Sequence, residues 1–253
     1  KPALERHGMP ATVFVTSGFV GTDREFWSAT LARVLLEQRT IPSDLRLVVR
    51  GKAHEWTLGD AGSSSDAESH AYQDWRGWDP VAPTPKHALL QALYALLLPL
   101  PHQERQSVMH DFTAWAGASA TAVGLPPWLS AHEVRALTQG GLIEVGAHSV
   151  SHSLLAGLPE GAQRDEIRQS KRQIEEIVGR PALAFAYPYG KPDSYTAATV
   201  RLVREAGFAS ACSNWPGVVT RGSNCFELPR LHVYDWDGEQ FERQLSSWWD
   251  GEW

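Results

Sequence analysis

The sequence of 253 residues predicts an α/β fold in which βα units surround a mainly parallel sheet or barrel. The run 11–16 is short, β-branched and aromatic, and it is bounded by Pro10 and Gly18, as is typical of a buried strand. From about residue 130 onward, strand-like runs alternate with helical patterns. A hydrophobic fraction of 43% with a charged fraction of 21% is typical of a globular chain and disfavours disorder or a coiled coil.

Each later element is predicted from its own residues. Further strands are expected over four short apolar runs, 142–147, 182–186, 208–212 and 231–233. Helices are expected over 130–137, 165–178, 196–206 and 237–249. Ser130 with Glu133 forms a capping-box pattern at a helix start. Asp237 with Gln240 does the same for the last helix. The charged run 163–176 predicts a solvated helix face.

Residues 23–128 interrupt the alternation of strands and helices. They hold two apolar helical stretches, 26–36 and 87–98, and a polar stretch, 59–69, with the composition of a mobile loop. We therefore expect a largely helical insertion at 23–128 within a single domain that spans residues 1–253.

Composition excludes several classes of protein. A net charge of −6 argues against a nucleic-acid-binding surface, which is normally basic. The longest apolar run, 88–100, is shorter than the ~20 residues that a transmembrane helix needs. Two cysteines are too few for a disulfide scaffold. The first residues have neither an initiator methionine nor the pattern of a signal peptide, so the compartment stays open, as does the oligomeric state.

Two histidines, His148 and His152, directly follow the predicted strand 142–147. If the chain turns helically after the strand, imidazoles at this spacing lie about 5–6 Å apart and could share a metal ion. In an extended strand they would lie ~13 Å apart, which is too far for one ion. A metal site therefore requires the strand to end near Ala147, and the alternative is a pair of surface or hydrogen-bonded histidines.

The loop that follows the predicted strand 182–186 carries the sequence Tyr187-Pro188-Tyr189-Gly190. Proline fixes φ and glycine permits a tight turn, so this loop could direct a backbone N–H into a cleft. Such an amide is a candidate donor to an oxyanion. The alternative is a turn that contributes aromatic side chains to the core.

Taken together, HSxxH after one strand and FxxPYG after the next resemble the polysaccharide deacetylase family, also called the NodB-homology or carbohydrate esterase family 4 group. The stretches PALERHGMPATVFV, LPRLHV and DWDG are similar to those of one bacterial subgroup, and the resemblance covers nearly the whole chain. It implies a distorted (β/α)7-type barrel. It also implies metal-dependent hydrolysis of N-acetyl or O-acetyl groups on a polysaccharide or oligosaccharide.

The resemblance assigns roles to individual residues. It implies that His148 and His152 bind a divalent metal ion, for which zinc is the best-suited element. The backbone N–H of Tyr189 would stabilise the oxyanion. His232 would protonate the leaving amine as a general acid, since imidazole titrates near neutral pH, and the alternative is a histidine without a catalytic role. The residues implied to contact substrate are Leu231, in the acetate pocket, with Tyr187 and Pro188.

The sequence departs from the family pattern at one important place. Family members begin with a TFDDG-type strand, whose two aspartates act as the catalytic base and the third metal ligand, and no such motif occurs here. Asp237 is accounted for as a helix N-cap. Ala186 also stands where many members carry an arginine. We therefore expect an N-terminally incomplete sequence, a barrel that lacks its first strand, weak metal binding, and little or no activity from residues 1–253.

Two other functions stay open. A non-catalytic carbohydrate-binding relative would use some of the eleven tryptophans to stack on sugar rings, although core packing is the favoured explanation for most of them. The candidates for such stacking are Trp75, Trp78 and Trp128, three of the tryptophans that lie in or beside the insertion. A different barrel metallohydrolase would need further ligands, for which the candidates are His7, His54, His70 and His132.

Overall fold

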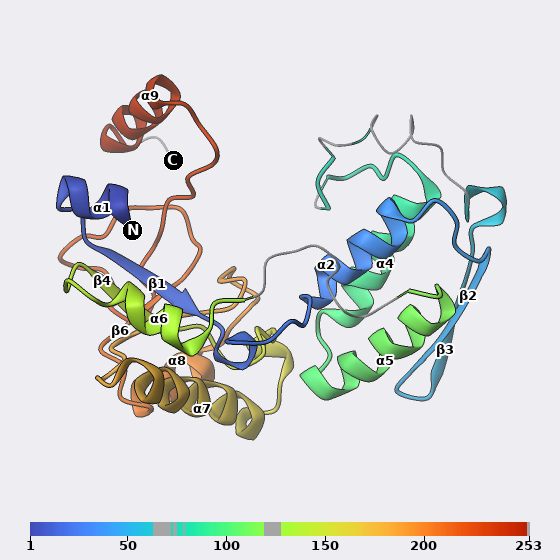
Figure 1. The fold of residues 1–253 in the computed structure, drawn as a ribbon, viewed down its shortest axis with the longest axis horizontal. Helices are drawn as coiled ribbons and strands as arrows, with labels where there is room; N and C mark the ends of the chain where they lie inside the picture. Colours follow the sequence, from blue (N-terminus) through green and yellow to red (C-terminus); the bar gives the residue numbers. More distant parts are fainter. Residues whose placement is uncertain (63–71, 73–74, 78, 119–127, 252–253) are drawn as a thin grey trace. The chain divides into compact units, whose positions relative to one another are not determined.

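The computed structural model describes residues 1–62, 72, 75–77, 79–118 and 128–251 (Figure 1). The chain divides into two compact units. The first, here called the sheet unit, comprises Lys1–Val20 and Leu129–Trp253. The second, here called the inserted unit, comprises Gly21–Trp128. Each unit is described separately.

The sheet unit is built on a parallel sheet with the strand order β1-β4-β5-β6. The strands are β1 (Ala11–Val15), β4 (Ile143–Ala147), β5 (Ala184–Ala186) and β6 (Ser210–Cys212). The helices are α1 (Pro2–His7), α6 (Ala131–Leu137), α7 (Glu160–Val178), α8 (Ala197–Glu205) and α9 (Gly238–Trp249), with short 3₁₀ turns at Ser17–Phe19 and Leu155–Gly157. The predicted α/β fold with a parallel sheet is thereby confirmed. None of the helices among the described residues is long and apolar enough to cross a membrane.

Helix α7 covers the sheet with an apolar stripe. Ile167 and Ile174, two turns apart, are both fully buried beside Phe185 of β5 and Val203 of α8. Full burial of one such side chain stabilises the fold by roughly 1.5–3 kcal/mol. The capping boxes predicted for α6 and α9 are both present, and they fix where these helices begin.

The predicted strand at 231–233 is wrong. Leu228 forms an isolated parallel bridge with Cys212, but beyond it the backbone N–H of Arg230 bonds instead to the carbonyl of Trp215. Val233 is 54% exposed. An apolar, β-branched run forms a strand only where a neighbouring edge offers continuous pairing, and this segment has left the edge of β6.

The inserted unit has its own core and is less helical than expected. Its helices are α2 (Trp27–Ala32), continued by a π-helical turn over Arg33–Glu37, then α4 (Pro85–Leu97) and α5 (His102–Trp115). An antiparallel hairpin, β2 (Asp44–Val49) with β3 (Lys52–Thr57), was not predicted, and neither was α5. Fully buried side chains from the helices and from the hairpin share this core, among them Leu31, Leu35, Leu47, Leu93 and Phe112. Of the expected loop 59–69, residues Gly59–Gly62 form a 3₁₀ turn and residues 63–69 lie outside the described part.

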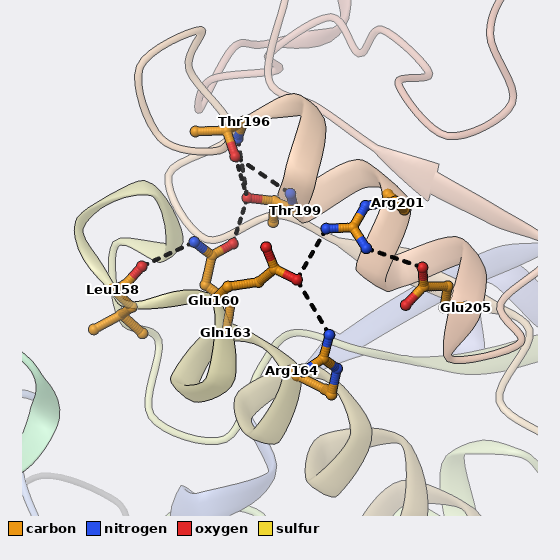
Figure 2. A network of polar contacts seen from close by, with 8 residues as sticks. All are labelled: Leu158, Glu160, Gln163, Arg164, Thr196, Thr199, Arg201 and Glu205. Carbon is orange, nitrogen blue, oxygen red and sulfur yellow. Dashed lines mark hydrogen bonds and ion pairs between the residues drawn. The ribbon is translucent and has the colours of Figure 1, made fainter.

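Helices α7 and α8 are joined by two different polar contacts (Figure 2). Gln163 is only 5% exposed; its Nε2 donates to the carbonyl of Leu158 at 2.9 Å, and its Oε1 accepts from Oγ1 of Thr199 at 2.6 Å. Nearer the surface, Arg201 pairs with Glu160 at 2.9 Å. The prediction of a solvated face over 163–176 is therefore wrong for Gln163, which the packing of α8 encloses.

The two contacts should differ in their effect on stability. Gln163→Ala leaves buried polar groups without their partners, so we expect it to lower the free energy of unfolding by about 1–3 kcal/mol. Arg201→Ala breaks a half-exposed ion pair between the same two helices, α7 and α8. It should lower the free energy of unfolding far less. Chemical denaturation followed by circular dichroism measures both, and equal losses would contradict this assignment.

Candidate metal centre

The candidate site begins where the ladder between β1 and β4 continues past the ends of both strands. The N–H of His148 donates to the carbonyl of Val15 at 3.0 Å. Beyond it, the N–H of Ser17 donates to the carbonyl of Ser149 at 3.1 Å, and that of Gly18 donates to Val150 at 2.9 Å. A Cβ on Gly18 would lie 2.6 Å from the Val150 carbonyl oxygen, so only glycine permits this approach. The loop after β4 is therefore held in place by backbone bonds.

The chain turns sharply at this point. Strand β4 ends at Ala147, as the metal hypothesis requires, and Ser149 and His152 both adopt left-handed backbone conformations, with φ of 59° and 54°. The buried Oγ of Ser149 accepts a hydrogen bond from the N–H of His152 at 2.9 Å. This turn, rather than a helical one, brings the rings of His148 and His152 to a centroid separation of 4.7 Å. The structure therefore brings the two predicted ligands together.

The hydrogen bonds of His148 define which nitrogen can bind a metal. Its Nδ1 lies 2.7 Å from the carbonyl oxygen of Ala186, at the end of β5. Since a carbonyl only accepts, Nδ1 carries the proton and Nε2 keeps its lone pair. Burial lowers the pKa of His148 to about 4, and the nearby Arg230 adds to this effect while the Ala186 carbonyl opposes it. The imidazole is therefore neutral at pH 7, which is the form that binds metals.

The loop after β5 places Tyr189 against the histidine pair. Tyr189 has a left-handed φ of 63°, and its ring lies 4.8 Å from that of His152. Gly190 packs so closely on the next loop that a Cβ would lie 2.7 Å from the backbone nitrogen of Asn214. Its N–H donates to the carbonyl of the buried Pro188 at 2.7 Å. The ring of Tyr189 thus lies beside His152, and the role of its backbone N–H remains a prediction.

Tyr187 has a different environment from the one predicted. Its ring is 1% exposed and stacks on Tyr195 at 4.1 Å, and its hydroxyl donates to the carbonyl of Phe226 at 2.9 Å. Burial raises the pKa of this hydroxyl above its ordinary value. The side chain of Tyr187 therefore belongs to the core, and its contact with substrate remains a prediction.

The two site residues predicted from the LPRLHV segment, Leu231 and His232, lie in the irregular segment that follows β6. Leu231 is partly buried, whereas His232 is exposed and its ring lies 4.6 Å from that of Tyr234. The role of His232 as a general acid remains a prediction.

Two charged residues near the pair were not anticipated. Arg230 donates from Nε to the carbonyl of Ser213 at 2.7 Å, and its charge acts on His148. Glu166, on α7, accepts hydrogen bonds from the loop between the two histidines. Glu166 lies in the charged run interpreted as a solvated face. What distinguishes Glu166 from the other glutamates of that run is its partner, the loop between the two histidines, which only the folded chain brings to it.

The residues present fit part of a metal centre. Two imidazoles with ring centroids 4.7 Å apart, one of them neutral with its tautomer held by a carbonyl, match the ligand chemistry of zinc. Across the described ranges, no group of three or more His, Cys, Asp or Glu residues gathers around a common point. The further candidate ligands His7, His54 and His132 therefore belong to no such group, and His70 lies outside the described residues. Asp237 caps α9, as predicted, by accepting from the N–H of Gln240.

Comparison with known proteins identifies the sequence around this site. Residues 107–211, which include both histidines and the Tyr189 loop, match the polysaccharide deacetylase family model. This segment is thus similar to polysaccharide deacetylases. The deacetylase segment thus runs from α5 to β6 and includes β4 and β5, the strands that lead into the two site loops.

Several individual proteins are similar to the chain. The YxkH protein of Bacillus subtilis (strain 168), a polysaccharide deacetylase by name, is 23% identical over 112 residues, which are 44% of this chain and 39% of that protein. Among solved structures, BC0361, a polysaccharide deacetylase from Bacillus cereus, is 24% identical with a TM-score of 0.42 and covers 49% of this chain. The Streptococcus pyogenes deacetylase PplD, solved in complex with acetate, is 19% identical with a TM-score of 0.43, covering 48% of this chain and 52% of its own. The chain spans less than two fifths of YxkH and of BC0361, at 39% and 38% of their lengths.

The low pKa of His148 in the deacetylase segment predicts a defined pH dependence. Unfolded histidine titrates at 6.5, so between that pH and about 4 the unfolded chain binds a proton that the folded chain does not. Folding should lose up to about 3 kcal/mol of stability as the pH falls through this window, and none of this loss should occur above pH 7.

An NMR titration of the His148 ring measures the shift directly. The expected midpoint is near pH 4. A midpoint for His148 close to 6.5 would show that its ring is solvated in solution.

Proposed function

We propose that this chain carries a metal-dependent polysaccharide deacetylase domain that hydrolyses N- or O-acetyl groups on a carbohydrate polymer. The observation that carries the proposal is the pair of imidazoles of His148 and His152, with ring centroids 4.7 Å apart, at the carboxyl end of β4 within the segment that matches the family model. Ligand-binding residues of parallel α/β folds gather at this end of the strands. The proposal includes a distorted (β/α)7-type barrel containing β1, β4, β5 and β6, with residues 23–128 as an insertion in a single domain.

The chain's own residues would divide the work at the acetyl group. A divalent ion, with zinc as the first candidate, would supply Lewis-acid activation of water and of the acetyl carbonyl. His148 and His152 would hold it, through Nε2 in the case of His148, because its Nδ1 is bonded to Ala186. The Tyr189 loop, packed on the His152 ring, would present its backbone N–H to the carbonyl oxygen as negative charge develops.

Two further residues belong to the proposal for reasons of sequence. His232 would protonate the leaving group, and Leu231 would line the acetate pocket with Pro188, the buried member of the Tyr189 loop. An exposed imidazole can exchange protons with solvent, which suits a general acid. For His232 to act, its imidazole has to lie within hydrogen-bond reach of the leaving group when substrate is bound.

Metal binding tests the proposal. Titration of the metal-free chain with Zn²⁺, followed by calorimetry, should show weak binding, since zinc enzymes normally supply three protein ligands and the described pair supplies two. His148→Ala and His152→Ala should each weaken this binding at least about tenfold. The matched control is His132→Ala, which removes an exposed imidazole on α6 and should leave the affinity unchanged.

The alternative of a non-catalytic carbohydrate-binding relative is separated by a second measurement. Acetate release from an acetylated chito-oligosaccharide that requires both histidines and added Zn²⁺, however slow, supports the deacetylase. Binding of the same oligosaccharide without any acetate release, unaffected by His148→Ala, supports the binding protein. Zinc binding that survives both histidine substitutions would contradict the proposed site.

A further inference from the structure

We propose that Glu166 is the positioning residue of the histidine pair: its carboxylate holds the backbone between His148 and His152 in the turn that brings the two imidazoles together. This inference rests on the proposed metal function and concerns a residue outside the pair and its two loops. It assigns Glu166 no contact with substrate or metal.

The carboxylate of Glu166 is fully engaged by the loop. One oxygen, Oε2, accepts hydrogen bonds from the backbone N–H groups of Val150 and Ser151, both at 2.9 Å. The other, Oε1, accepts from Oγ of Ser151 at 2.6 Å, and this hydroxyl lies 2.7 Å from Oγ of Ser153. Since both oxygens face the loop, Glu166 is an anchor for the backbone rather than a third metal ligand.

The loop needs such an anchor because its conformation is unfavourable on its own. Ser149 and His152 are non-glycine residues in left-handed conformations, each of which costs of order 1–3 kcal/mol. The serines at 149, 151 and 153 are almost fully buried, so the amides among them cannot turn to solvent. Hydrogen bonds to a carboxylate are about twice as strong as those between neutral groups, and three of them offset much of this cost.

Helix α7 gives the carboxylate a fixed position. Ile167, the next residue, is fully buried in the core of the sheet unit. Two turns further along the same helix, Oε1 of Gln173 accepts a hydrogen bond from Oγ of Ser17, just after β1. The helix therefore holds both segments that meet at the site, the end of β1 and the loop after β4.

Replacing Glu166 should disturb the pair without touching either imidazole. Glu166→Ala removes both acceptor oxygens and with them all three hydrogen bonds, and we expect the dissociation constant for Co²⁺ to rise about 10–100-fold, the range measured when a residue that orients metal ligands is removed. The visible absorption bands of bound Co²⁺ should also change, because they report the ligand geometry. Glu166→Gln keeps an oxygen that can accept from the two amides, so it should restore most of the affinity and the spectrum.

A matched control comes from the same helix. Glu175 also accepts from a backbone N–H, that of Ala182 at 3.1 Å, and pairs with Lys171 at 2.9 Å. Glu175→Ala therefore removes comparable interactions from α7 away from the histidine loop. It should leave the Co²⁺ affinity within about twofold of the parent chain, which separates positioning from a general loss of helix stability.

A metal-free measurement keeps this inference separate from the proposed function. Ring protons of His148 and His152 should show nuclear Overhauser contacts in the parent chain, and Glu166→Ala should weaken or abolish them. Unchanged Co²⁺ affinity together with unchanged ring contacts in Glu166→Ala would overturn the inference. If Glu166→Ala does not fold, the Co²⁺ affinity and the ring contacts are measured on Glu166→Gln instead. A measurable loss in either readout supports the positioning role, and the absence of a loss in both readouts overturns it. If the parent chain binds no Co²⁺, the metal function fails and the ring contacts alone decide the role of Glu166.

Discussion

Parallel pairing between β1 and β4 is the interaction on which the candidate site depends. It pairs Val15 with Ala147, which the inserted unit separates in the sequence. The pairing continues through the backbone of His148, Ser149 and Val150. A slip of one residue in this register would turn every side chain of β4 to the opposite face and carry His148 away from the Ala186 carbonyl. Because loop-closure entropy rises only slowly with length, a long insertion between two paired strands is compatible with a stable sheet.

The site itself is a place where regular structure stops and local strain is concentrated. Three of its residues, Ser149, His152 and Tyr189, have left-handed φ angles, a conformation that non-glycine side chains rarely adopt. Each lies in a loop that directly follows a parallel strand, and each is fixed by neighbours from other elements. Such strain persists only where the surrounding structure over-determines it, and it is common at functional sites. In the sheet unit the determining groups are the end of β1, the carbonyl of Ala186 and the carboxylate of Glu166.

The inserted unit contains two elements that were not predicted from the sequence, the β2–β3 hairpin and helix α5. Residues of β2 alternate between exposed and buried positions along the whole strand, and Arg50-Gly51 makes a two-residue hairpin turn with φ of 51° and 78°. Both features are visible in the sequence, but a six-residue alternation is short beside the apolar helical runs around it. Helix α5 was missed for a different reason. Its polar composition conceals Val108 and Phe112, which are buried only because the hairpin and α4 enclose them, and Arg105 is buried with them.

By itself, the sequence determined the features that depend on near neighbours in the chain. The capping boxes at Ser130 and Asp237, the strand end at Ala147, and the four-residue spacing between His148 and His152 all follow from residues a few positions apart. Tertiary structure alone decided the rest: the burial of Tyr187, the absence of a strand at 231–233, the protonated nitrogen of His148, and the selection of Glu166 from a run of similar charges. Each of these depends on a partner far away in the sequence. Hydrogen bonding and burial act through space, so only the packing of α7, β5 and β6 around the loop could specify them.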